Sequence, residues 1–180
     1  MVLPSAWKRS PGRWRACRFR PTKAPLFKTP QQRAGVRSKT WSTPLMANTL
    51  YDYARQRFLE GQFNWMTDTI KVILVDTGAY TPQTAIHQYL SDIPSSSRIA
   101  GPVTLTAKTT TGGAADGADV TFTSVSGASI EAIIIYKDTG TESTSPLIAF
   151  IDTATGLPIT PNGGDIIVTW DNGTNKIFKV

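Results

Sequence analysis

The apolar residues of this chain are concentrated in short runs, and these runs constrain its fold more than any other feature. The clearest are residues 69–76, 129–138 and 146–152, which are rich in β-branched and aromatic side chains and are bounded by turn-forming residues. Such runs are typical of β-strands. Residues 129–138 are apolar on both faces apart from Glu131, which predicts a central strand covered on both sides.

Weaker strand signals lie in the middle of the chain. Residues 102–108 and 120–125 alternate apolar and polar side chains, as half-buried strands do. The glycine-rich segment between them, residues 109–119, lacks the GK[ST] ending of a phosphate-binding loop and does not lead into a helix. We therefore predict a simple surface loop for that segment.

The strongest local turn signal lies near the C-terminus. Asn172-Gly173 separates two β-like runs within residues 165–180, and this pair is preferred in two-residue hairpins. The hairpin would place Ile167 opposite Phe178. With this element the sequence predicts seven or eight short strands, and hence an all-β fold made of a single antiparallel β-sandwich or jelly-roll-like domain.

Charge divides the chain at Met46. Residues 1–45 contain 11 of the 19 Lys and Arg residues and no acidic residue. Residues 46–180 contain the other 8 basic residues and all 13 acidic residues. Residues 1–45 also hold six of the twelve prolines and show no sustained period. We expect either a disordered basic extension or upstream sequence translated from a start codon placed too early, and the composition favours the second. Nucleic acid is an expected partner only if these residues belong to the native protein.

Residues 46–62 predict a short N-terminal helix. Asn48 or Thr49 can cap it, its apolar residues recur at steps of three and four, and Gly61 supplies a C-terminal stop. The predicted organisation is therefore an extension over residues 1–45, a helix over 46–62 and a β-sandwich domain over 63–180. No run approaches 18 apolar residues, so no membrane partner is expected.

Residues suited to catalysis are sparse. His87 is the only histidine and Cys17 the only cysteine, which excludes multi-histidine metal sites and a disulfide framework. A triad of His87 with a serine such as Ser91 and with Asp92 remains formally possible, but a surface or half-buried histidine is the commoner case. We therefore predict no enzyme activity, no catalytic residue and no cofactor.

Two further site types were considered. Asp116 and Asp119 can contact a calcium ion but lack the ligand density of a dedicated site, so no metal is expected. Trp65 and Trp170 can offer stacking platforms for a sugar, although core packing is the commoner use of such residues. A carbohydrate-binding β domain therefore stays open as an alternative function.

The remaining signals favour contact surfaces. An amphipathic helix beside near-continuous apolar strands can bury faces against further copies of the chain or a larger lattice. The predicted interface combines positions on the helix, expected to dock, with positions on the central strand, expected to act as buried support: Leu50, Tyr53, Phe58, Glu131 and Tyr136.

The two runs that start at "MANTLYDYARQRFLEG" and at "EAIIIYKDTGTESTSPLIAFID", covering residues 46–94 and 131–180, resemble a family of small structural proteins of tailed bacteriophages and prophages. The resemblance begins at Met46 and carries no catalytic residue. It implies a virion protein made in the cytoplasm of the bacterial host. Within that class we expect a capsid decoration, or cement, protein on the capsid surface, with the major capsid protein and further copies of itself as partners. The alternative is a tail, neck or fibre-associated subunit.

Overall fold

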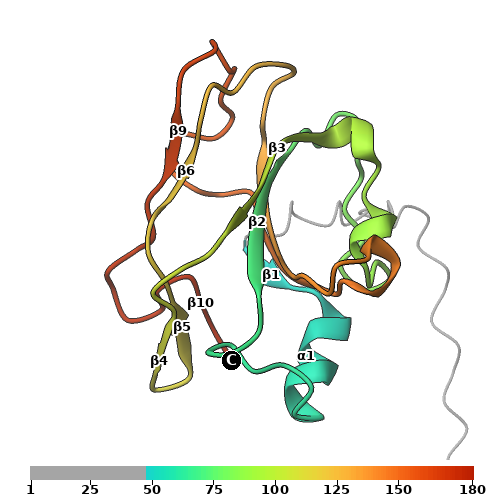
Figure 1. Cartoon of the computed structure of the whole chain (residues 1–180), viewed down its shortest axis with the longest axis vertical. Helices are drawn as coiled ribbons and strands as arrows, with labels where there is room; N and C mark the ends of the chain where they lie inside the picture. Colours follow the sequence, from blue (N-terminus) through green and yellow to red (C-terminus); the bar gives the residue numbers. More distant parts are fainter. Residues whose placement is uncertain (1–47) are drawn as a thin grey trace, which may run out of the picture. The chain divides into compact units, whose positions relative to one another are not determined.

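The structure is a computed structural model that describes residues 48–180 (Figure 1). The predictions made for residues 1–45 lie outside this range. The described residues form three sheets of five, three and two strands, and every strand pair is antiparallel. The predicted all-β fold is confirmed.

The five-stranded sheet forms the centre of the fold. Its strand order is β1 (Thr49–Leu50), β8 (Leu147–Ile151), β7 (Ala132–Lys137), β2 (Ile70–Val75) and β3 (Arg98–Thr104). All but the last residue of β7 are buried, with Ile133 and Ile135 on one face and Ile134 and Tyr136 on the other. A strand without charged residues in its centre can be covered on both faces, as the sequence predicted.

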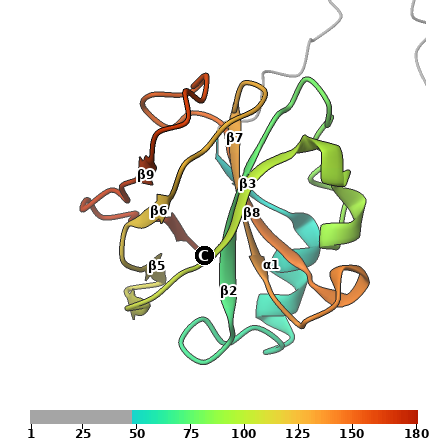
Figure 2. The ribbon, with the colours of Figure 1, turned by 45° about the horizontal axis from the view of Figure 1, so that its top comes forward.

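The two smaller sheets cover one face of the central sheet, as Figure 2 shows. They are formed by β4 (Thr109–Thr111), β5 (Ala114–Asp116) and β10 (Phe178–Lys179), and by β6 (Val120–Phe122) and β9 (Ile166–Val168). Val120 and Phe122 point inward from β6, which the alternating pattern predicted. The layer of small sheets over the central sheet is the sandwich-like part of the fold.

The opposite face is covered by α1 (Asp52–Leu59) and by short 3₁₀ turns, of which η1 (Leu90–Asp92) and η2 (Ser95–Ser97) precede β3 and η3 (Glu142–Thr144) precedes β8. Tyr51, Ala54 and Ile93 are fully buried here. The Arg98 guanidinium donates to the carbonyl oxygens of Leu90 and Ile93 at 2.9 and 2.6 Å, which ties the turns to the sheet.

The predicted helix is wrong at its N-terminal end. α1 begins only at Asp52, because Thr49 and Leu50 form β1 and pair with Phe150 and Ala149 of β8. The expected caps are therefore not used as helix caps. The Asn48 side chain instead accepts hydrogen bonds from the backbone N–H and the hydroxyl of Thr153.

The predicted C-terminal hairpin is also wrong. Ile167 pairs with Thr121 of β6, and Phe178 pairs with Ala115 of β5, so the two are not partners. Between them, the backbone N–H of Trp170 donates to the carboxylate of Asp119 and its indole donates to a backbone carbonyl. These bonds hold the chain after β9 against the β5–β6 connection and separate the two strands.

The glycine-rich segment, predicted as a loop, contains a hairpin of its own. β4 and β5 pair directly, and Gly112 and Gly113 between them both have positive φ, 59° and 81°. Two such residues are what a tight hairpin turn requires. The loop is therefore limited to the turn between these two short strands and to residues 117–119, which connect β5 to β6.

Candidate docking surface

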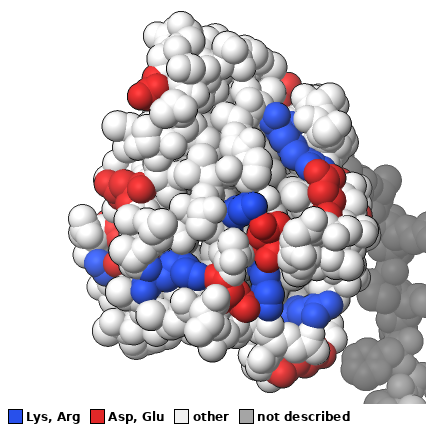
Figure 3. All heavy atoms as spheres, viewed as in Figure 1, with Lys and Arg blue, Asp and Glu red and all other residues white. Residues whose placement is uncertain are grey.

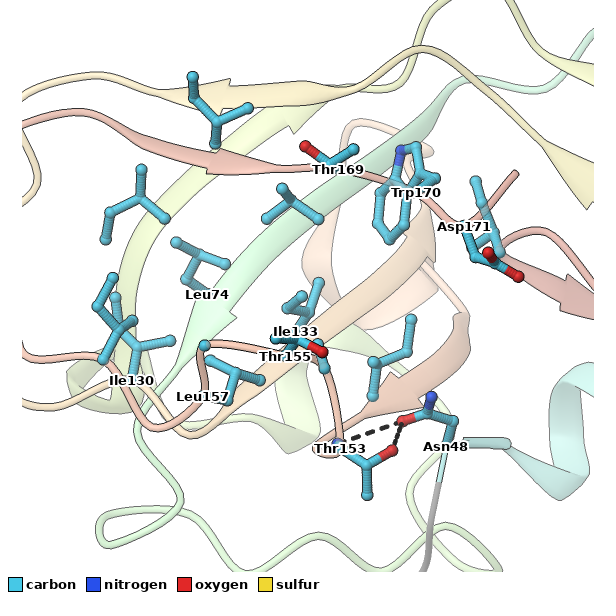
Figure 4. A pocket seen from close by; sticks show the side chains of 18 of the residues that line it. Asn48, Leu74, Ile130, Ile133, Thr153, Thr155, Leu157, Thr169, Trp170 and Asp171 are labelled. Atoms are coloured by element: carbon cyan, nitrogen blue, oxygen red, sulfur yellow. Dashed lines mark hydrogen bonds between the residues drawn. The ribbon is translucent and has the colours of Figure 1, made fainter. Parts of the chain in front are cut away.

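The layer of small sheets leaves one side of the sandwich open. A hollow of about 700 Å³ lies there between the central sheet and β9 (Figure 4). Leu74 and Ile133 approach it from the central sheet and Ile130 from the segment before β7, and Trp170 faces them from the segment that follows β9. Core side chains thus form the floor of an open depression.

A second hollow of about 870 Å³ adjoins the first and lies between β1, α1 and β10. Its apolar lining includes Leu50, Phe58, Leu59 and Phe178. The two hollows share several lining residues and are therefore continuous: Asn48, Ile151, Asp171, Lys176 and Ile177. A smaller hollow of about 340 Å³ continues past Phe58 and Phe178 to Met66.

Most of the exposed large apolar side chains line these hollows. Five such side chains occur in residues 48–180, and four of them, Leu59, Met66, Ile167 and Val180, border the three hollows with exposures of 90, 50, 63 and 64%. Ile86 is the fifth. We call the three hollows and these four residues the apolar groove. The lining of the two larger hollows is mixed, with polar side chains such as Asn48, Asp171 and Lys176 beside the apolar ones. Exposed apolar side chains that gather around hollows favour a site of association over chance exposure.

The charges near the groove are mainly basic. Arg55, Lys176 and Lys179 line the second hollow, where Asp171 is the single acidic side chain. Lys176 pairs with Asp116 at 3.3 Å, whereas Lys179 forms no ion pair among residues 48–180. Elsewhere acidic and basic side chains lie next to one another, as Figure 3 shows for one face. On that face there is no large basic surface of the kind that binds a phosphate backbone.

Two of the five predicted interface residues border the groove. Leu50 and Phe58 line the second hollow, although Leu50 is only 8% exposed and contributes mainly to the core. Tyr53 lies elsewhere on α1, where its hydroxyl is 2.7 Å from that of Tyr89 and the Arg57 guanidinium stacks on its ring.

The two predicted interface residues on the central strand have internal roles. The Glu131 carboxylate accepts a hydrogen bond from the backbone N–H of Thr77 at 2.9 Å, which anchors the loop after β2. Tyr136 is 2% exposed, so its surface is not available to a partner. Burial, with a smaller contribution from Asp138, raises the pKa of Tyr136 to about 12. This phenol is therefore neutral at physiological pH and serves as a core residue.

His87 is not assembled into a triad. Its Nδ1 lies 2.7 Å from the Tyr80 hydroxyl, which in turn lies 3.4 Å from the Tyr51 hydroxyl. The Asp92 carboxylate accepts two backbone N–H groups at the start of η1 instead of orienting His87. Tyr51, Tyr80 and His87 thus provide hydrogen-bond partners for one another within the layer that covers the central sheet.

The two tryptophans considered as sugar platforms are largely buried. Trp65 and Trp170 are 5% and 7% exposed, and each indole N–H donates to a backbone carbonyl, that of Asp116 and of Ala118 respectively. Both side chains therefore pack in the core in the commoner manner. Trp170 presents only one edge to the groove.

Asp116 also has an internal partner, Lys176, and the described part of the chain contains no group of three or more His, Cys, Asp or Glu side chains placed to hold a metal ion. Among residues 48–180, no helix has the length and apolar character needed to cross a membrane.

The sequence did not identify the residues that form most of the groove. Leu59 carried a usable signal, since it directly follows Phe58 and falls outside the stripe of apolar residues on α1. No sequence pattern marked Ile167 and Val180 as groove residues. Alternation within a strand shows which residues share a face, but it does not show whether a neighbouring strand covers them. Comparison of the chain with protein-family models and with curated proteins finds no match.

Proposed function

We propose that this chain is a structural protein of a tailed bacteriophage particle that decorates the capsid and stabilises the assembled head. The apolar groove carries the proposal, because it offers a large contact surface on a small domain. The resemblance of residues 46–94 and 131–180 to phage structural proteins supports the same role.

The proposed mechanism is linkage between binding and assembly. A protein that binds the assembled shell, and not its free subunits, stabilises the shell by the free energy of binding. Contacts that are weak one by one become strong when an oligomer of this chain engages several capsid subunits at once. The proposed location is the outer capsid surface, and the proposed partners are the major capsid protein and further copies of this chain.

A tail, neck or fibre-associated subunit would use the same kind of surface, and no described residue favours it over decoration. Sugar binding loses its support, because the indole faces of Trp65 and Trp170 are buried.

The test compares phage particles that are produced with and without the gene for this chain. We expect hundreds of copies per particle by quantitative mass spectrometry, and heads without the protein should release DNA at a lower temperature. Adding back the purified full chain should restore heat resistance. A few copies per particle would instead identify a tail or neck subunit, and absence of the protein from particles would overturn the proposal.

A further inference from the structure

All three sheets end at the apolar groove. β1 is the terminal strand of the central sheet, β10 of the three-stranded sheet, and β9 belongs to a sheet of only two strands. Residues of each of these three strands line the groove. Among residues 48–180, these strand edges have no further paired strand, and they lie beside an apolar floor.

Backbone groups of two edge strands are directed into the second hollow. The N–H of Tyr51 donates to Ile148 and the N–H of Val180 donates to Gly113, both at 3.0 Å, so these residues face their own sheets. In antiparallel pairs the bonding direction alternates from one residue to the next. The backbone N–H and C=O of Leu50 and Lys179 therefore point away from their sheets, and both residues line this hollow. The Leu50 carbonyl oxygen also accepts a local hydrogen bond from the Thr49 hydroxyl at 3.3 Å.

An open edge beside an apolar floor is suited to strand addition. In this binding mode, main-chain hydrogen bonds supply affinity, and alternate side chains of the added strand enter pockets. Proteins commonly blunt free edges with charges, prolines or covering loops, because free edges recruit other chains. Here Lys179 is the charged residue at the edge, and the apolar side chains of Leu59 and Val180 next to the hollow remain exposed.

Charge restricts the segment that can bind. Arg55 on α1 and Lys179 on β10 both line the second hollow, and the Arg55 guanidinium contacts the Asp52 carboxylate at 3.3 Å and the Thr49 hydroxyl at 3.1 Å. A basic segment would be repelled there, whereas acidic side chains would be attracted.

We propose that the groove binds an extended segment of a partner polypeptide as an added β-strand, with apolar side chains at alternate positions and acidic side chains near Arg55 and Lys179. The inference rests on the proposed function for the source of this segment, which is a subunit of the capsid lattice. In this proposal the added strand forms main-chain hydrogen bonds with the edges of β1 and β10.

The decisive variants alter backbone pairing without removing apolar surface. Lys179→Pro removes the N–H that points into the groove, and a proline is tolerated at such an edge position because that N–H is not bonded to β5. Lys179→Ala removes the same side chain but keeps the N–H. We expect the proline variant to bind heads at least about tenfold more weakly than the alanine variant, as loss of a hydrogen bond and steric conflict would produce. Equal binding by the two variants would overturn strand addition.

A second pair of variants locates the surface. Leu59→Glu places a charge in the groove, and Ile86→Glu places the same charge at the exposed apolar residue outside it. Both side chains are largely exposed, so both variants should fold, which thermal unfolding checks. We expect loss of head binding only for Leu59→Glu. Normal binding by Leu59→Glu with loss of binding by Ile86→Glu would overturn the assignment.

If the wild-type chain does not bind heads at all, the proposed capsid partner fails and the groove is tested with a synthetic probe. The probe is a peptide of about nine residues, within the usual strand length, that alternates Val and Thr and has Glu at each end. Slowed hydrogen exchange at the amides of Leu50 and Lys179 on adding this peptide supports strand addition. Unchanged exchange at saturating peptide overturns it.

Discussion

The two faces of the central sheet are built from similar apolar residues but are closed to different degrees. On the face under α1, Tyr51, Ile93 and Ile134 have no exposed surface. On the face under the small sheets, Ile133 and Ile151 form part of the floor of an open groove. Both faces therefore contribute buried residues to the core, but only the face under the small sheets borders an open hollow.

Neighbouring residues on β7 allow a matched test of this difference. Ile134→Ala removes buried methyl groups from the closed face, and we expect a loss of about 4 kcal/mol in the free energy of unfolding. Ile133→Ala faces the groove, where space already exists, and should cost about 2 kcal/mol. Urea unfolding of the two variants measures the difference. Equal losses would show that the groove-facing side of β7 is packed as tightly as the other side.

The closure of the α1 face depends on Arg98. Arg98→Ala would remove the side-chain donor to the Ile93 carbonyl oxygen and one of the two donors to the Leu90 carbonyl oxygen, and we expect a loss of about 2 kcal/mol. Glu142 pairs with the same guanidinium at 2.5 Å, but 59% of its side chain is exposed.

Glu142→Ala is therefore the control for Arg98→Ala. It removes only the exposed ion pair and should destabilise the protein much less than Arg98→Ala does. If the two variants were equally destabilised in thermal melts, the ion pair and not the carbonyl contacts would hold the turns.

The smallest effect is expected at the margin of the groove. Asp152 lies between the groove residues Ile151 and Thr153, and its enclosed Oδ1 has no hydrogen-bond partner among the described residues. Burial raises the pKa of this carboxyl, so the folded state takes up its proton at a higher pH than the unfolded state. The charge therefore destabilises the fold at neutral pH, and this penalty disappears as the pH falls through the raised pKa.

Asp152→Asn should stabilise the protein by about 0.5 kcal/mol at pH 7, a value reduced for the partial exposure of the residue. The gain over wild type should shrink in acid, where the wild-type carboxyl is neutral. Unfolding curves at several pH values check this, and a gain that does not change with pH would contradict the assigned cause.

The sequence predicted the elements that depend on local pattern. The strands β2, β7 and β8 were predicted because continuous runs of β-branched residues favour buried strands. The inward-facing residues of β6 were predicted from the alternation of apolar and polar side chains. The hairpin at Asn172-Gly173 failed because a local turn preference competes with contacts distant in sequence, here those of Trp170 with Ala118 and Asp119. No local pattern contains those contacts.

The docking surface was harder to predict than the fold. Residues on α1 were expected at an interface, and Phe58 does border the groove, but the exposed positions Ile167 and Val180 became visible only when the strands were placed. Tyr136 was expected to support the interface from a buried position, and the fold buries it. Exposure is set by which strands pair, and pairing is not a local property.

The two edges of the central sheet differ in a way that limits the size of any assembly built on it. At the β3 edge, the pairing with β2 is irregular, Pro102 provides no N–H, and Gly101 has a φ of +99° where a Cβ would lie 2.8 Å from the Val72 carbonyl oxygen. Such an edge does not accept a further strand. The β1 edge of one copy therefore cannot pair with the β3 edge of another copy. The molecule is suited to saturable attachment, with one partner for each groove, and not to growth into fibres.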